Sequence, residues 1–186
     1  MFKEFRTAIG MLLCVSLLTG VLYPLLITGL TQVLFPEQAK GSLIRDAQGQ
    51  VRGSHLLGQS FTGAAWFHSR PSAVDFATLP SGASNLAPSN PELAVQVRQR
   101  ISALAPDSEQ PVPMALVTTS GSGVDPHLPV GAVLYQVHRV AQARQLSSEA
   151  LMQLIEVHTE RPFIGPAVVN VLALNQALQM IGVTRE

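Results

Sequence analysis

Charged residues and cysteine are both scarce in this chain of 186 residues. Lysine and arginine number 12, and so do aspartate and glutamate; together they form 13% of the chain, against roughly 25% in a typical soluble domain. The net charge is zero and the only lysines are Lys3 and Lys40, so the sequence lacks the basic surface that binds nucleic acid. The single cysteine, Cys14, excludes an intrachain disulfide and a multi-cysteine metal site.

Common catalytic motifs are missing as well. The chain has no Walker phosphate loop, no His-Glu-x-x-His metal motif and no Gly-x-Ser-x-Gly nucleophile turn. Its five histidines include no pair spaced four residues apart on a predicted helix. An enzyme that acts alone is therefore disfavoured, and no directly bound cofactor or metal is expected.

The longest uncharged stretch lies near the N-terminus. Residues 7–36, between Arg6 and Glu37, carry no charge, and a bilayer core of about 30 Å needs roughly 20 helical residues. The competing interpretation is a cleaved signal peptide, whose apolar region would span only about 7–15 residues before a small-residue cleavage site. The length of the run favours a membrane anchor, with residues 1–6 as a tail.

Small residues and one proline interrupt this apolar run. Gly10, Gly20 and Gly29 permit close approach of neighbouring helices, and Pro24 predicts a kink or a locally rearranged hydrogen bond. Lys3 and Arg6 precede the span while Lys40 and Arg45 follow it, so the basic residues are nearly balanced. Long domains cross membranes regardless of charge, which predicts a cytoplasmic N-terminus and an extracytoplasmic domain at residues 37–186.

That domain is predicted to be of mixed α/β class, with about three helices and a small sheet. Strand signals at residues 42–44 and 51–54 flank a turn-rich loop. Helices are expected from Asn90, as cap, through Leu104 to a stop at Pro106, over residues 130–144, and over residues 148–158 with Ser147 as cap. Arg98 and Arg100 are expected on the solvent face of the first of these.

Three shorter segments complete the expected elements. Residues 114–119 form a short apolar run that reads as a buried strand, and residues 175–180 look helical. Residues 168–172 could form either a strand or a helix, because periodicity does not discriminate in so short a run.

Residues 60–91 are rich in Ser, Gly, Ala, Asn and Pro, yet they contain the only tryptophan, Trp66, together with Phe61, Phe67 and Phe76. A loop of this length with such side chains either contacts a partner or packs on its own core. Arg70 could bind a partner carboxylate bidentately or clamp the loop internally. Both alternatives remain open from sequence.

Two local patterns suggest chemistry of their own. The turn at residues 120–123, Ser-Gly-Ser-Gly, resembles a phosphate-binding loop, but it lacks the dinucleotide spacing and no lysine follows it, which favours a structural turn. Asp125, His127 and a nearby serine, Ser120 or Ser122, could form a nucleophilic site. A membrane-anchored extracytoplasmic hydrolase is thus the alternative hypothesis, and a free-standing solute-binding module is a weaker third.

Several segments, in order along nearly the whole chain, resemble the C-subunit family of the Kdp-type potassium-transporting P-type ATPases of bacteria. They are residues 23–26 (YPLL), 41–44 (GSLI), 51–54 (VRGS), 57–63 (LGQSFTG), 67–73 (FHSRPSA), 84–86 (SNL), 89–91 (SNP), 116–118 (LVT), 122–125 (SGVD), 139–144 (RVAQAR), 169–170 (VN) and 174–175 (LN). The chain departs from the family at Pro129-Val130, where Ser or Thr followed by Pro is usual, and at Gly165-Pro166-Ala167.

This resemblance implies a single-span accessory subunit of a bacterial inner-membrane complex, without catalytic residues of its own. A channel-like subunit there binds potassium, a P-type subunit hydrolyses ATP, and the C subunit supports assembly and activity. The family is also described as a catalytic chaperone that raises the ATP affinity of the ATPase subunit. Because only residues 1–6 are expected in the cytoplasm, any such effect should reach ATP indirectly. The candidate partner-contact residues are Pro24, Phe61, Phe67, Arg70, Asn85 and Asp125.

Overall fold

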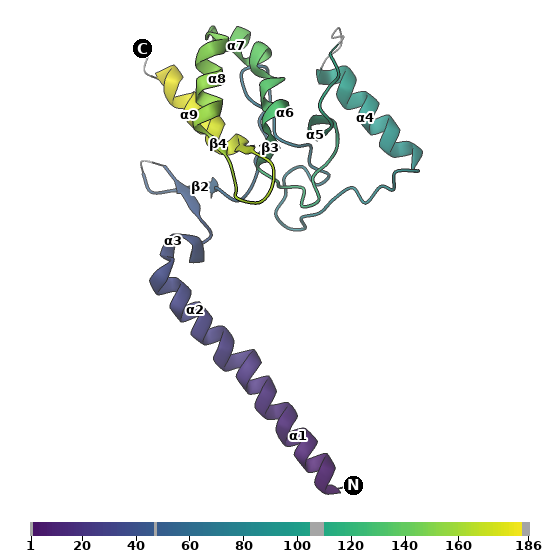
Figure 1. The fold of residues 1–186 in the computed structure, drawn as a ribbon, viewed down its shortest axis with the longest axis vertical. Helices are drawn as coiled ribbons and strands as arrows, with labels where there is room; N and C mark the ends of the chain where they lie inside the picture. The colour runs from purple at the N-terminus through teal and green to yellow at the C-terminus, as the bar shows by residue number, and fades with distance from the viewer. Residues whose placement is uncertain (1, 47, 105–109, 184–186) are drawn as a thin grey trace. The chain divides into compact units, whose positions relative to one another are not determined.

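The computed structural model describes residues 2–46, 48–104 and 110–183. The chain divides into two compact units, Met1–Ser54 and His55–Glu186. The first unit holds a long apolar helix and a hairpin, and the second holds a mixed α/β region (Figure 1). The mixed α/β class is therefore confirmed.

One continuous helix of 33 residues, Phe2–Leu34, begins the first unit. It consists of α1 (Phe2–Leu17), a π-helical turn (Leu18–Leu22) and α2 (Tyr23–Leu34), and none of its residues is buried. Among the described residues it is the only helix long and apolar enough to cross a membrane. Its length and unburied apolar surface are those of a single-pass membrane helix.

The π-helical turn lies where Pro24 disturbs the helix. Pro24 has no N–H to donate to the carbonyl four residues earlier, and just before it the Tyr23 N–H donates to the Leu18 carbonyl oxygen, five residues back. The predicted rearrangement at Pro24 is thus a widened turn, a common device at helix irregularities. Two threonine hydroxyls near this turn and beyond it donate within the helix: Thr19 Oγ1 to the Val15 carbonyl at 2.8 Å and Thr31 Oγ1 to the Ile27 carbonyl at 2.9 Å, which suits an apolar surrounding.

After the short α3 (Pro36–Ala39), the predicted hairpin forms from β1 (Leu43–Arg45) and β2 (Val51–Ser54), paired antiparallel with a shift of register after Ile44. Asp46 organises its loop, because its Oδ1 accepts from the Gln48 and Gln50 N–H groups at 3.0 and 2.9 Å. The hydrogen bond from the Gln50 N–H, with smaller contributions from the Arg52 side chain and the Gln48 N–H, holds the pKa of Asp46 below its usual value. The hairpin belongs to the same compact unit as the long helix.

The core of the second unit surrounds a three-stranded antiparallel sheet in the order β3-β5-β4. Strand β3 (His127–Pro129) pairs with β5 (Val168–Asn170), which pairs with β4 (Thr159–Glu160). Helices α6 and α9 contact this sheet, and α8 packs against α6, α7 and α9 (Figure 1). The most buried apolar side chains of the core include Phe67, Leu128, Val133, Val140, Leu151, Ile155, Val169, Val171, Leu174 and Leu178.

Two predicted helices form as expected. Helix α4 (Pro91–Leu104) starts after Asn90, whose Oδ1 accepts from the Glu92 N–H at 3.0 Å, and its predicted stop at Pro106 lies outside the described residues. Helix α8 (Ser148–Val157) is capped by Ser147, whose Oγ accepts from the Ala150 N–H at 3.1 Å. Arg98 is exposed as expected, but Arg100 is half-buried and donates to the Val117 carbonyl at 2.9 Å, so its expected solvent exposure is wrong.

The single helix expected at residues 130–144 is divided into α6 (Val130–Leu134) and α7 (Val137–Arg144). At the junction the Gln136 N–H donates to the Val133 carbonyl, three residues back, which tightens the chain locally. The predicted strand at residues 114–119 is wrong, since α5 (Met114–Val117) is a single helical turn that follows Pro113. Only four residues are helical here, too few for a 3.6-residue period to appear in the sequence.

Residues 168–172 contain both structures that the sequence allowed, a strand followed by the start of a helix. Strand β5 ends at Asn170, and α9 (Val171–Val183) begins at the next residue. Asn170 makes this change possible, because its Oδ1 accepts from the Ala173 N–H at 3.1 Å, as a helix cap does. The predicted helix at residues 175–180 lies within α9.

Candidate functional site: the clamped irregular segment

Residues 55–90 connect the hairpin to α4 without a helix or a strand. Backbone groups in such a segment still need hydrogen-bond partners wherever they are buried. Side chains from α7, α9 and the residue before α7 supply those partners. The segment is therefore held in a defined conformation against the core of the second unit.

Two buried amide side chains pair with the segment in the manner of a β-strand. Asn175 accepts from the Phe67 N–H at 3.0 Å and donates to the Phe67 carbonyl at 2.8 Å. Gln136 accepts from the His68 N–H at 2.8 Å and donates to the His68 carbonyl at 3.0 Å. Each amide thus satisfies both backbone groups of one residue, which anchors the Phe67 side chain in the core.

Two arginines of α7 hold the preceding turn. Arg139 donates to the Ala64 and Trp66 carbonyls at 2.8 and 2.9 Å and to Gln136 Oε1 at 2.7 Å. Arg144 donates to the Ala65 carbonyl at 2.7 Å, and its guanidinium lies 4.3 Å from the centre of the Trp66 ring. Burial lowers the pKa of both guanidiniums, yet arginine stays charged at neutral pH, so these are charge-assisted bonds.

His68 lies at the centre of this network. Its Nε2 is 2.9 Å from the Gly63 carbonyl oxygen. Burial lowers the pKa of His68 below 6.5, the hydrogen bond to Gly63 opposes that shift, and the charge of Arg139 adds to it. The neutral imidazole is therefore the form that suits the folded chain.

The segment continues to Arg70, which meets the turn before β3. Arg70 Nη2 donates to the Thr119 carbonyl at 3.1 Å, and Nη1 lies 3.7 Å from Asp125 Oδ2. Asp125 Oδ1 accepts from the His127 N–H at 3.0 Å. The internal clamp that the sequence left open for Arg70 is thus present, although the side chain is 30% exposed.

The same region argues against the hydrolase alternative. His127 Nδ1 is 3.8 Å from Asp125 Oδ1, and Nε2 is 3.9 Å from Glu160 Oε1. The imidazole nitrogen that would take a proton from a serine in a catalytic triad faces a carboxylate instead. Among the described residues, no three His, Cys, Asp or Glu side chains gather as they would around a metal ion.

The turn at residues 120–123 is packed against the segment. Gly123 has φ of +73°, and a Cβ there would lie 2.6 Å from the Gly82 carbonyl oxygen. The Ser120 N–H donates to the Pro71 carbonyl at 3.1 Å, and Ser122 Oγ accepts from the Val124 N–H at 3.2 Å. This is the structural turn that the sequence favoured over a phosphate-binding loop.

The candidate contact residues lie in different surroundings. Phe67 is fully buried, with 0% exposure, so its ring packs in the chain's own core. Phe61 is half-buried and lies against Trp66, with ring centroids 5.5 Å apart. Asn85 is exposed with φ of +54°, and Pro24 is exposed on the apolar helix.

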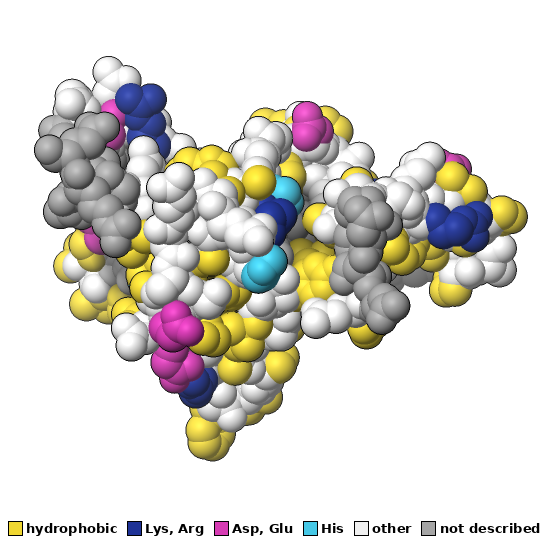
Figure 2. Space-filling model, turned by 90° about the horizontal axis from the view of Figure 1, so that it is seen from above, with side chains coloured by type: hydrophobic (Ala, Val, Ile, Leu, Met, Phe, Trp, Pro, Cys, Tyr) yellow, Lys and Arg dark blue, Asp and Glu magenta, His cyan; other side chains and the backbone are white. Residues whose placement is uncertain are grey.

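Sequence reasoning missed the four residues that hold the segment: Gln136, Arg139, Arg144 and Asn175. Their polar side chains on otherwise apolar helix faces were the available signal, since a buried amide or guanidinium needs partners. Charged groups elsewhere are sparse and scattered among apolar and polar side chains on the face seen in Figure 2.

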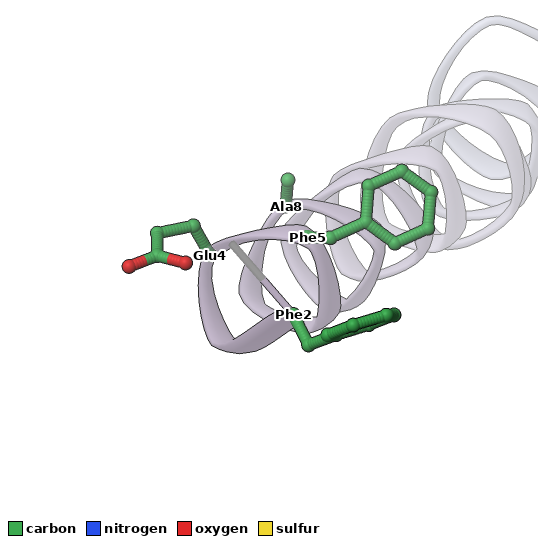
Figure 3. Close-up of a pocket in the computed structure, with 4 residues that line it drawn as sticks. All are labelled: Phe2, Glu4, Phe5 and Ala8. Atoms are coloured by element: carbon green, nitrogen blue, oxygen red, sulfur yellow. The ribbon is translucent and has the colours of Figure 1, made fainter.

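A hollow beside Phe2, Glu4, Phe5 and Ala8 is of a different kind (Figure 3). All four residues belong to the first turns of α1, and the two phenylalanine rings project from one side of the helix while Glu4 projects from another. One free helix does not enclose a ligand, so we interpret this surface as part of the apolar helix exterior.

The chain matches a family model described as "KdpC: K+-transporting ATPase, c chain" over residues 5–180. It is 59% identical over 185 residues to the potassium-transporting ATPase KdpC subunit of Pseudomonas putida strain F1, covering 100% of each chain. It is 60% identical over 178 residues to the corresponding subunit of Pseudomonas aeruginosa strain PAO1, covering 96% of this chain and 97% of the relative.

Proposed function

This chain belongs to the KdpC family, the c chains of K+-transporting ATPases, and from that membership we propose that it is the accessory subunit through which an ATP-driven potassium importer assembles and stays stable. KdpC chains are non-catalytic, so the hydrolase alternative is wrong. The observation that carries the proposal is the match over 100% of both this chain and a curated relative. The implied partners are a channel-like potassium-binding subunit, a P-type ATPase subunit and the bilayer.

Within that complex, the apolar helix is the membrane anchor, with the N-terminus in the cytoplasm and residues 37–186 outside. The unburied helix surface and its small residues Gly10, Gly20 and Gly29 support contact with partner helices. Phe61, Arg70, Asn85 and Asp125 form the proposed contact surface of the outer domain, and Pro24 that of the span. Phe67 contributes from below this surface by anchoring the segment. Exposed apolar side chains such as Leu79, Phe163 and Ile164, at 91%, 103% and 84% exposure, also fit a subunit that is covered by partners.

The first experiment is affinity purification through a tag at Glu186 from native membranes in mild detergent, followed by mass spectrometry. We expect a multi-span channel protein and a P-type ATPase to co-purify. The variant Arg70→Ala/Asn85→Ala should reduce their recovery, while Arg98→Ala/Gln142→Ala, which changes two exposed residues elsewhere, should not. Purification of the chain alone from potassium-starved cells would refute the proposal.

The catalytic-chaperone role belongs to the same proposal in an indirect form. With the domain outside, only the first residues of the chain reach the cytoplasm, so an effect on ATP affinity has to pass through the membrane helix. A photoreactive ATP analogue applied to the intact complex should therefore label the ATPase subunit and leave residues 37–186 unlabelled. Labelling within that domain would refute the indirect route.

A further inference from the structure

A cavity of about 260 Å³ lies between the irregular segment and the helices α4 and α5. Its walls combine apolar side chains, including Phe61, Phe76 and Leu116, with His68 and two arginines, Arg70 and Arg100. None of the eleven described residues that line it is Asp or Glu. The cavity thus has a cationic lining together with an apolar one.

Arg70 contributes a donor without an acceptor. Its Nη2 and Nη1 face the Thr119 carbonyl and Asp125, but its Nε is buried and has no hydrogen-bond partner among the described residues. A buried polar atom left unpaired is costly, and in native proteins it commonly marks the place of a bound water, ion or ligand.

Arg100 brings a second guanidinium from α4. It donates to the Val117 carbonyl at 2.9 Å and to Gln96 Oε1 at 3.5 Å. Within the described ranges no carboxylate lies within ion-pair distance of it. Burial lowers its pKa, but the group keeps its charge at neutral pH, so the cavity contains a cation that no described acid neutralises.

We infer that this cavity binds a carboxylate carried on a small apolar group. The two guanidiniums supply charge-assisted donors of the kind that carboxylates accept, and the phenylalanine rings and Leu116 accommodate the apolar part. The volume is slightly below the roughly 300 Å³ at which pockets for drug-sized ligands begin, so the ligand is of the size of an aromatic acid. The same chemistry occurs in a free organic acid and at the C-terminus of a protein chain ending in an apolar residue.

Binding can be measured by titration calorimetry on the full chain in lipid nanodiscs, with empty nanodiscs as the blank. The probes are benzoate, for a free acid, and acetyl-Gly-Gly-Phe with a free carboxylate, for a chain terminus. Benzamide and the C-terminal amide of the peptide are the uncharged counterparts. We expect at least one carboxylate probe to bind and its amide to bind at least about tenfold more weakly, since a hydrogen bond to a charged group is lost.

Three variants locate the site. Arg100→Gln removes a charge, Arg70→Lys removes the Nε donor, and Ala103→Leu fills the cavity from an exposed position on α4. Each should weaken binding about tenfold or more. The matched controls Arg98→Gln and Ala94→Leu, at exposed positions of the same helix outside the cavity lining, should bind as the unmodified chain does.

The outcomes separate the sources and the alternatives. Binding of benzoate alone assigns the site to a free acid, and binding of the peptide alone assigns it to a chain terminus. Three results would each overturn the inference. The first is an equal affinity for a carboxylate probe and its amide, and the second is an equal affinity of Ala103→Leu and Ala94→Leu for the carboxylate probe. The third is no binding of either carboxylate probe up to about 10 mM. Because the test uses the isolated chain, its result is independent of the assembly experiment above.

Discussion

At the scale of single residues, Gly123 is a position where the second unit leaves no room for a side chain. Its φ of +73° disfavours residues with a Cβ, and the added atom would lie 2.6 Å from the Gly82 carbonyl and 2.7 Å from Val74 Cγ2. Because the first neighbour is backbone, a rotamer change does not relieve the contact. The turn before β3 and the irregular segment are fitted to each other here.

Gly123→Ala should therefore lower the free energy of unfolding of the second unit by about 2 kcal/mol or more, from the left-handed backbone and the overpacking together. Denaturant unfolding followed by Trp66 fluorescence measures it, since Trp66 is the only tryptophan. The control is Gly121→Ala, where an added Cβ meets nothing within 4 Å. Equal stability of the two variants would contradict the argument.

His68 makes a prediction about pH. Burial holds its folded-state pKa below 6.5, so the unfolded chain binds a proton at a pH where the folded chain does not. The stability that neutral His68 contributes is fully present above about pH 6.5, and it declines as the pH falls toward the folded-state pKa of His68. The unfolding free energy should therefore decrease between about pH 7 and 5.5, and the decrease should be smaller in His68→Gln.

The slope of stability against pH is the quantity to compare, because His68→Gln also changes packing at every pH. His138→Gln replaces an exposed histidine on α7 and serves as the matched control. A slope in His68→Gln equal to that of the control and of the unmodified chain would show that His68 does not titrate as described.

At the scale of elements, α7 acts as the clamp of the irregular segment. Arg139 alone donates to three carbonyls of the turn, those of Gly63, Ala64 and Trp66. Since these donors come from one guanidinium, a single substitution removes all three bonds and leaves the Arg144 contacts to Ala65 and Trp66 on this turn. Together with Asn175 of α9, which bonds to the Phe67 backbone, this clamp explains how a long stretch without secondary structure keeps Phe67 in the core.

Arg139→Met should destabilise the second unit by about 2 kcal/mol, because several charge-assisted hydrogen bonds to the backbone are lost together. The released turn should expose Trp66, which shifts its emission to longer wavelength and raises its quenching by acrylamide. Arg98→Met, on the exposed face of α4, should leave emission and quenching unchanged. A Trp66 spectrum unaltered by Arg139→Met would refute the clamp.

The elements that the sequence predicted correctly are those with local signals. For the apolar helix the signal was the length of the uncharged run, and for the hairpin it was the turn-rich loop around Asp46. For α4 and α8 the signals were the cap residues Asn90 and Ser147. The division between α6 and α7 was missed because it depends on Gln136, whose side chain bonds to His68, 68 residues away. The helical turn α5 was missed because four residues carry no readable period.

The candidate site was less predictable for the same reason. The aromatic segment was recognised from its composition, yet the residues that position it lie on α7 and α9, more than 70 residues further along the chain for Arg139 and more than 100 for Asn175. Sequence left two alternatives for the aromatic side chains, partner contact and core packing. Phe67 packs in the core, whereas Phe61 stays half-buried at the cavity described above.

At the scale of the whole molecule, the proposed orientation of the chain in the membrane rests on the length of the domain at residues 37–186 rather than on the distribution of basic residues. Lys3 and Arg6 precede the uncharged stretch at residues 7–36, and Lys40 and Arg45 follow it, so basic residues alone give no strong bias, whereas long domains cross regardless of charge. In a Cys14→Ser background, which removes the only cysteine, Gln48→Cys should react with an impermeant maleimide in right-side-out spheroplasts. Phe2→Cys should react only after lysis. Both positions are exposed, so the reverse pattern of labelling would invert the topology and return direct contact between the domain and ATP to consideration.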